Sequence, residues 1–312
     1  MTNKEIKREA KARLSGNWKI AILNLFVVGV LTTIINEVLL GVTGIGGGFA
    51  DIMSSISDPY AMGAETISPA ASIFASFGSI AVSFISAVFA VGYDWALLDM
   101  VDGEKLTVEG IFQTANSKRF FKVIGISIVT GLFVFFWSLL LVIPGIVKAY
   151  SYSQAYNIYK DDPEVDVVGA INRSKELMKG KKWKFFILQF SFIVWYLIPV
   201  ALFLAFILGS VNTIRYQFQE VSIYANDEFV GFLLGMLLVV LAFGLAMFLI
   251  SLYVEPYRRT AAQIFYRDLV GYPELDADEG VYEEQKTYAT EQIDPYEETE
   301  ESSSSDDRLD RF

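Results

Sequence analysis

Five long apolar runs without a single Asp, Glu, Lys, Arg or His constrain this chain more than any other feature. A bilayer core about 30 Å thick takes roughly 20 helical residues to cross, so four of the runs are long enough and the first is nearly so. A soluble protein of this size would interrupt such runs with polar residues at the helical period. We therefore expect an integral membrane protein. The runs are Ile20–Asn36, Ile73–Tyr93, Val123–Val147, Phe185–Ile214 and Phe229–Val254.

Two residue types that are common in catalytic and metal sites are missing. The sequence of 312 residues contains no Cys and no His. This excludes disulfides, thiol nucleophiles and zinc–thiolate sites, and it removes the commonest general base. No run carries an ionisable group near its midpoint, where ion-coupled transporters usually place one. We predict that the protein is not an enzyme and that it binds no cofactor, metal ion or nucleic acid.

Lysine and arginine are unevenly distributed over the segments between the runs, and short basic segments remain in the cytoplasm. The basic segments are residues 4–19, 101–122, 160–184 and 258–267. Residues 41–70 contain no Lys or Arg, and residues 209–228 contain only Arg215. The predicted order is therefore in, out, in, in, out, in. It places the protein in the cell membrane with both termini in the cytoplasm.

Two consecutive cytoplasmic segments require an even number of crossings between residues 122 and 160. Pro144 breaks the helical hydrogen-bond ladder and Gly145 relaxes the backbone, so we interpret this pair as a turn followed by a short or re-entrant return. One kinked helix that violates the charge rule is the alternative. The predicted fold is an all-α polytopic transmembrane bundle of about six crossings, near residues 18–40, 71–98, 122–143, 146–160, 184–208 and 229–255.

A polar, amphipathic segment precedes each odd-numbered crossing. Residues 3–14 form the first, Thr107 is the predicted N-cap of the second, and Asp162-Pro163-Glu164 is the predicted start of the third. Such helices lie in the cytoplasmic headgroup plane, where basic residues meet anionic lipid. The predicted apolar faces are Ile6, Ala10 and Leu14 in the first segment, Val108, Ile111, Phe112 and Ala115 in the second, and Val167, Ile171, Ser174 and Met178 in the third. We hypothesise three units, each an interfacial helix followed by a membrane hairpin.

Four sequence motifs occur in a recognisable order: Lys4–Lys11 with Leu14–Trp18, Pro144–Tyr152, Arg173–Gly180, and Pro256-Tyr257 through Phe265–Leu269. In these motifs the chain resembles a membrane-protein family of Gram-positive bacteria that is known only as a domain of unknown function. The resemblance extends over about residues 3–272. It implies a polytopic membrane protein without an established activity, and it supplies no catalytic residues.

Seven charged residues near the ends of the crossings are candidates for contact with lipid or a partner. Glu255, Arg258 and Arg259 close the last crossing, and the arginines are candidates for binding an anionic headgroup; a positive anchor with a paired Glu255 is the alternative. Asp94 and Asp99 are five residues apart, about 140° around a helix, so they do not form a carboxylate dyad. They suit a cation site or interfacial pairing with Lys or Arg. Lys148 and Arg173 complete the set.

The net charge of −11 comes from the C-terminus, because residues 273–312 contain 15 acidic and three basic residues. We predict a disordered acidic cytoplasmic tail there, either a solvating extension or an arm for a basic protein partner. The predicted function is a non-enzymatic membrane scaffold or envelope-associated factor acting through lipid and protein contacts. The alternative is a transporter or lipid-handling component with a substrate path near Pro144-Gly145.

Overall fold

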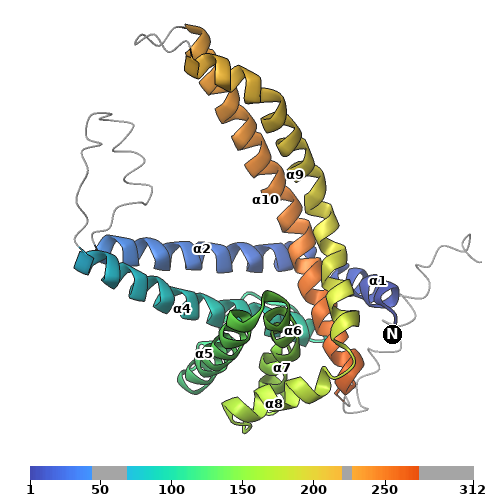
Figure 1. Cartoon of the computed structure of the whole chain (residues 1–312). Helices are drawn as coiled ribbons and strands as arrows, with labels where there is room; N and C mark the ends of the chain where they lie inside the picture. Colours follow the sequence, from blue (N-terminus) through green and yellow to red (C-terminus); the bar gives the residue numbers. More distant parts are fainter. Residues whose placement is uncertain (44–68, 220–226, 274–312) are drawn as a thin grey trace, which may run out of the picture. The chain divides into compact units, whose positions relative to one another are not determined.

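A computed structural model describes residues 1–43, 69–219 and 227–273, and this part of the chain consists of helices and short connecting segments, without a strand. The predicted all-α fold is confirmed. The chain divides into residues 1–271, which contain every described helix, and residues 272–312. The helices are α1 (Asn3–Leu14), α2 (Trp18–Thr43), α4 (Pro69–Val101), the 3₁₀ helix η1 (Glu109–Thr114), α5 (Ser117–Leu140), α6 (Val142–Tyr152), α7 (Ala155–Asp161), α8 (Val167–Leu177), α9 (Lys182–Gln219) and α10 (Asp227–Val270). Figure 1 shows their order.

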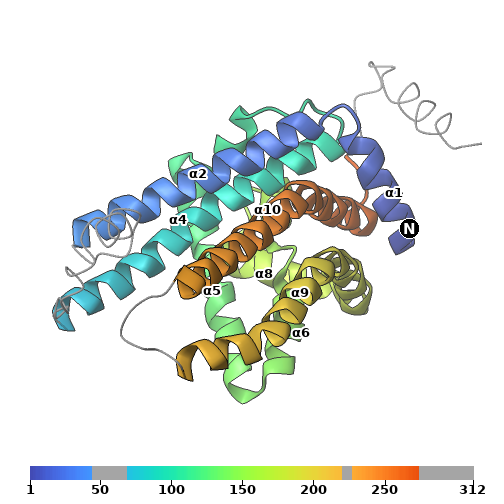
Figure 2. The same cartoon turned by 90° about the horizontal axis from the view of Figure 1, so that it is seen from above.

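Five of the described helices are long and apolar enough to cross a membrane: Trp18–Val38, Ser76–Val101, Ser117–Leu140, Lys182–Val211 and Leu234–Val270. In four of them only 6–11% of the most apolar stretch is buried within the protein, whereas the value for α4 is 44%. Leu, Ile and Phe side chains left outside the protein interior need an apolar solvent, and a bilayer provides one. Both views show α2 beside α4 and α9 beside α10 (Figures 1 and 2).

The C-terminal half of α4 is the centre of packing. Trp95, Leu97, Leu98 and Val101 are at most 1% exposed, so this part of the helix is covered on all sides. Its neighbours are α2, η1, α5, α7 and α10. Because α4 contacts these five elements, its last turns fix where the other helix ends lie.

The first amphipathic helix begins as predicted. Thr2 and Glu5 form a capping box, in which the Thr2 hydroxyl accepts from Glu5 N and the Glu5 carboxylate accepts from Thr2 N. Ile6, Ala10 and Leu14 are fully buried, which confirms the predicted stripe. The stripe packs on protein, because α1 contacts α10 and α9. A position in the headgroup plane stays a prediction.

The second and third amphipathic segments differ from their predicted bounds. Thr107 accepts from Gly110 N, but the element that follows is only the six-residue 3₁₀ helix η1. The close approach of η1 to α4 depends on Gly92, where a Cβ would lie 1.9 Å from Ile111 O. The third helix, α8, begins at Val167 with Asp166 at its N-cap, so the predicted start at Asp162-Pro163-Glu164 is wrong. Asp162 instead follows the end of α7.

The break after the third crossing lies at Leu141, three residues before the predicted turn at Pro144-Gly145. Leu141 is extended, with φ −162° and ψ 147°, between α5 and α6. Pro144 is the third residue of α6, a position where the missing N–H has no helical partner in any case. A Cβ on Gly145 would lie 2.0 Å from Ser138 Oγ, so glycine allows α6 to fold back closely on α5.

The predicted return over residues 146–160 corresponds to two short helices, α6 and α7, rather than to one crossing helix. The helix that contains the last predicted crossing, α10, continues through Pro256 to Val270. The count of six crossings and the side on which each terminus lies stay predictions. Residues 274–312 of the predicted acidic tail lie outside the described residues.

Candidate functional site: an ion-pair layer at the helix ends

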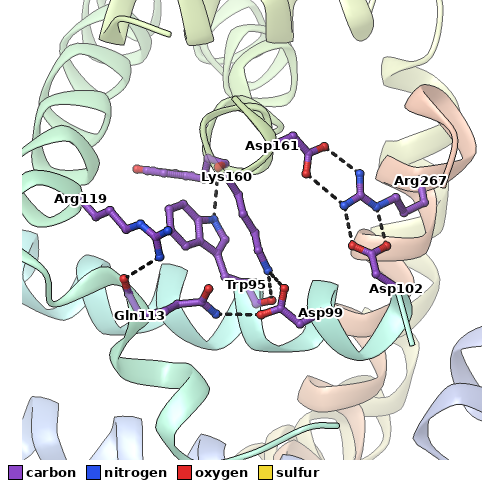
Figure 3. A network of polar contacts seen from close by, with 9 residues as sticks. Trp95, Asp99, Asp102, Gln113, Arg119, Lys160, Asp161 and Arg267 are labelled. Carbon is purple, nitrogen blue, oxygen red and sulfur yellow. Dashed lines mark hydrogen bonds and ion pairs between the residues drawn. The ribbon is translucent and has the colours of Figure 1, made fainter. Parts of the chain in front are cut away.

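Charged side chains from α4, α7 and α10 gather where the ends of these three helices meet (Figure 3). The buried half of α4 carries carboxylates on different faces, and α10 supplies arginines to two of them. Because α4 is closely packed here, each charge needs a partner within the protein. Three connected groups provide these partners.

Arg267 on α10 joins three helices. Its Nε and Nη2 donate to both oxygens of Asp102, at 2.7 and 2.6 Å, and its Nη1 and Nη2 donate to Asp161, at 2.7 and 3.0 Å. The Tyr266 hydroxyl donates to Asp161 Oδ2 at 2.6 Å. Arg267 is only 6% exposed, so its guanidinium is held by two carboxylates in a site with little water. Burial raises the pKa of the Asp102 carboxyl, and Arg267 offsets part of that rise.

Lys160 on α7 forms the second group. Its Nζ is paired with Asp99 Oδ1 and also donates to the Trp95 carbonyl oxygen, at 2.6 Å. Gln113 of η1 donates to the other Asp99 oxygen at 3.1 Å. Trp95 Nε1 donates to the Tyr156 carbonyl oxygen at 3.2 Å. These bonds tie α4 to both α7 and η1 (Figure 3).

Asp94 and Arg259, which the sequence offered as separate candidates, are paired in the third group. Arg259 donates to Asp94 Oδ1 at 2.8 Å and to Glu255 Oε1 at 2.9 Å. Arg258 holds both Glu255 oxygens, at 2.9 and 2.6 Å, and donates to Gln189 of α9 at 2.8 Å. Two carboxylates therefore balance two guanidinium groups, and they connect α4, α9 and α10.

The geometry explains why Asp94 and Asp99 do not act together. Asp94 binds Arg259 on α10, whereas Asp99 binds Lys160 on α7. This is the divergence expected from their spacing of five residues on one helix. Arg258 donates three hydrogen bonds and Arg259 two to groups within the protein, and contact of these arginines with lipid headgroups stays a prediction.

The two remaining candidates lie elsewhere. Lys148 Nζ lies 4.3 Å from the centre of the Trp137 ring, a cation–π contact between α6 and α5. Arg173 on α8 is paired with Asp162 at 2.6 Å and is largely exposed. Arg173 also lines a pocket of about 310 Å³ together with Asp161 and Tyr266, so it lies close to the Arg267 group.

Sequence reasoning missed Asp102, Asp161, Lys160 and Arg267 as a group. One signal was present, since Arg267 lies in the Phe265–Leu269 motif and follows the last crossing too far downstream for a simple interfacial anchor. Its partners are 165 and 106 residues away in the chain, so no local pattern identifies them. Within the described ranges, no group of three or more Asp or Glu side chains is placed to hold a metal ion.

The fold and this ion-pair layer define an all-helical protein with five helices apolar enough to span a membrane. The chain belongs to the family described as "Protein of unknown function (DUF975)", whose model matches it twice, over residues 1–150 and 139–272. The match covers the region of the resemblance inferred from the four motifs. No curated protein and no solved structure matches the chain.

Proposed function

We propose that this protein is a non-enzymatic membrane scaffold, a multi-pass protein of the cell membrane that acts through contacts with lipids and other proteins. One observation carries the proposal: the ion-pair layer joins α4 to both α7 and α10 by partly buried, mutually neutralising charges. Breaking the most buried of these pairs, Arg267–Asp102, costs about 3–5 kcal/mol. An alternating-access transporter rearranges such helix contacts in every cycle, so a layer of this kind favours a static role.

The apolar surface supports the lipid part of the proposal. Four of the five candidate spans leave about nine-tenths or more of their most apolar stretch unburied by the protein. The carboxylates of the layer support the absence of catalysis, because Asp94, Asp99 and Glu255 each accept from a cation. No acid–base pair is left free among these three groups.

The lipid-handling alternative has one observation in its favour. The five residues around the α5–α6 break are all apolar and 67–74% exposed: Leu139, Leu140, Leu141, Val142 and Ile143. Such a surface suits an acyl chain better than a polar substrate. A substrate path near Pro144-Gly145 would therefore carry lipid rather than an ion.

Pulsed electron resonance between two spin labels distinguishes the scaffold from a transporter, and the absence of native cysteine makes the labelling clean. One pair is placed at Lys105 and Lys179, both exposed. A second pair is placed at the far ends of α2 and α9, at Val38 and Leu208. We expect one narrow distance distribution for each pair in lipid nanodiscs. Two distance populations in each pair would contradict the scaffold and favour transport if the shorter distance of one pair becomes more populated as the shorter distance of the other becomes less populated.

A protein partner is proposed for the acidic C-terminus. Its net charge of −12 over residues 273–312 suits a basic surface. The test compares proteins cross-linked to the full chain with those cross-linked to a chain lacking these residues. A basic partner that is lost with the deletion supports the proposal, and an unchanged set of partners rejects it.

A further inference from the structure

A second polar site lies at the beginning of α5 and borders the ion-pair layer through Gln113, which donates to Asp99. It is a pocket of about 700 Å³ between η1, the first turns of α5 and the segment that joins α7 to α8. Its lining includes three cations and one carboxylate: Lys118, Arg119, Lys122 and Glu164. Asn116, Gln113 and Tyr159 add polar atoms to the lining.

The cations of this pocket differ from those of the ion-pair layer in having no carboxylate partner among the described residues. Lys122 Nζ donates to two backbone carbonyl oxygens, those of Pro163 and Val165, at 2.6 and 3.1 Å. Arg119 Nη1 makes one long hydrogen bond, 3.3 Å, to the Gln113 carbonyl oxygen. Carbonyl oxygens orient a cation but do not cancel its charge, so the pocket keeps an excess of positive charge.

Three features of the pocket suit a phosphate group. The N-terminus of α5, a helix of 24 residues, faces it and adds partial positive charge. The guanidinium of Arg119 and the ammonium groups of the lysines are the usual partners of phosphate oxygens. Tyr159 is only 3% exposed and forms a rigid wall of the pocket. Lys122 Nζ lies 5.1 Å from the centre of its ring, so the ring helps to position this ammonium group.

The position of the pocket along α5 indicates where the phosphate comes from. Lys118, Arg119 and Lys122 lie in the first turns of a helix that is apolar enough to span the membrane from Ser117. Phe121, in the same turns, is 70% exposed and directs an apolar ring away from the protein. Cations at the end of a spanning helix, beside an exposed aromatic ring, lie at the depth of phospholipid headgroups.

We infer that this pocket binds the phosphate ester of an anionic lipid headgroup, of the phosphatidylglycerol class, at the end of α5. The inference rests on the proposed function, because it names a lipid site for a protein proposed to act through lipid contacts. It places this lipid contact at residues other than the seven singled out from the sequence.

Calorimetric titration of the full-length protein in uncharged detergent tests the site. The ligands are short-chain phosphatidylglycerol and short-chain phosphatidylcholine, both below their critical micelle concentrations, and the soluble ester glycerol 1-phosphate. We expect phosphatidylglycerol to bind at least about tenfold more tightly than phosphatidylcholine. The double variant Lys118→Gln/Arg119→Gln loses about tenfold or more of that affinity, and Lys118→Arg/Arg119→Lys keeps most of it. Lys122 is left intact, because its bonds to Pro163 and Val165 support the fold.

The matched control is Lys179→Gln/Lys181→Gln, which removes the same charge from exposed positions between α8 and α9. An equal loss of affinity in the control and in the pocket variant overturns the site, as does equal binding of the two lipids. Binding of glycerol 1-phosphate that matches phosphatidylglycerol and is lost in the pocket variant keeps the phosphate site but replaces the lipid by a soluble ester. If phosphatidylglycerol shows no binding while both spin-label pairs keep one narrow distance distribution, the lipid site in the pocket is rejected. The scaffold proposal then still stands.

Discussion

Arg267 near the end of α10 binds Asp102, just after α4, through two parallel hydrogen bonds of 2.7 and 2.6 Å. This pairing joins two residues 165 positions apart, and Asp161 approaches the same guanidinium from α7. Three helix ends therefore depend on one side chain.

Replacing Arg267 by Gln leaves two carboxylates facing each other without a cation. We expect a loss of about 3–5 kcal/mol in the free energy of unfolding, measured by denaturation in mixed detergent micelles. Arg267→Lys restores the positive charge but not the planar guanidinium that binds two carboxylates at once. We therefore expect an intermediate loss in the free energy of unfolding. Arg13→Gln is the control, because Arg13 makes only a longer pair of 3.6 Å with Glu9 and should change stability by less than about 1 kcal/mol. Wild-type stability of Arg267→Gln would show that the layer does not hold the helix ends together.

The Lys160–Asp99 pair connects α7 to α4 and is tested by a double-mutant cycle. We expect Lys160→Met and Asp99→Asn each to destabilise the protein, and the double variant to lose less than the sum of the two. The interaction free energy should fall between about 0.5 and 3 kcal/mol. Strict additivity would mean that the two side chains do not interact in solution.

Gly145→Ala tests the close approach of α6 to α5. The added Cβ meets Ser138 Oγ at 2.0 Å and Ser138 Cβ at 2.9 Å, so we expect a loss of about 1–3 kcal/mol. Adding Ser138→Gly to Gly145→Ala removes both contacts and should recover part of the loss. Gly131→Ala is the matched control in α5, because nothing lies within 4 Å of its Cβ and alanine favours a helix. Equal changes in the free energy of unfolding for Gly131→Ala and Gly145→Ala would argue against the close packing of α6 on α5.

Asp162 gives a prediction about pH. Its hydrogen bond from Arg173 lowers the pKa of the Asp162 carboxyl below its ordinary value of 3.8. A lowered pKa means that the pair stabilises the fold fully above pH 3.8 and that this contribution disappears as the pH falls through the folded value. The difference in melting temperature between the wild type and Asp162→Asn should therefore be constant at neutral pH and shrink on acidification below pH 4. A difference that grows towards low pH would reverse the sign and refute the pairing.

Membrane topology is tested by single cysteines at Ser57, Asn172 and Ser304. Asn172 represents the segment between residues 160 and 184, because it is exposed on α8. With six crossings, an impermeant thiol reagent labels position 57 in intact cells and labels positions 172 and 304 only after permeabilisation. Labelling of position 172 from outside would mean that α6 and α7 do not return the chain to the cytoplasm.

The helical character of the chain and most of its long helices follow from local pattern. An uninterrupted apolar run such as Phe229–Val254 has one stable backbone form in lipid, because a helix satisfies its own hydrogen bonds. The Ile6, Ala10 and Leu14 stripe and its capping residues are likewise local, since i, i+4 spacing and the cap lie within a few turns. The predicted turn at Pro144 lies inside α6, because proline is tolerated in the first turn of a helix.

The ion-pair layer could not be predicted from local sequence pattern. Asp94 and Arg259 were both singled out as charges at helix ends, but only the packing of α10 against α4 brings them within 2.8 Å of each other. The sequence used Lys118, Arg119 and Lys122 only as evidence for a cytoplasmic segment. Only the folded structure shows that they line one pocket with η1 and Tyr159 and that none of them has a carboxylate partner in the described part of the chain. Sequence alone determined that this chain forms apolar helices with basic connecting segments, because hydrophobicity and charge are properties of neighbouring residues. Tertiary structure alone decided which charges neutralise each other and which remain open to a ligand, because electrostatic pairing depends on distance in space and not along the chain.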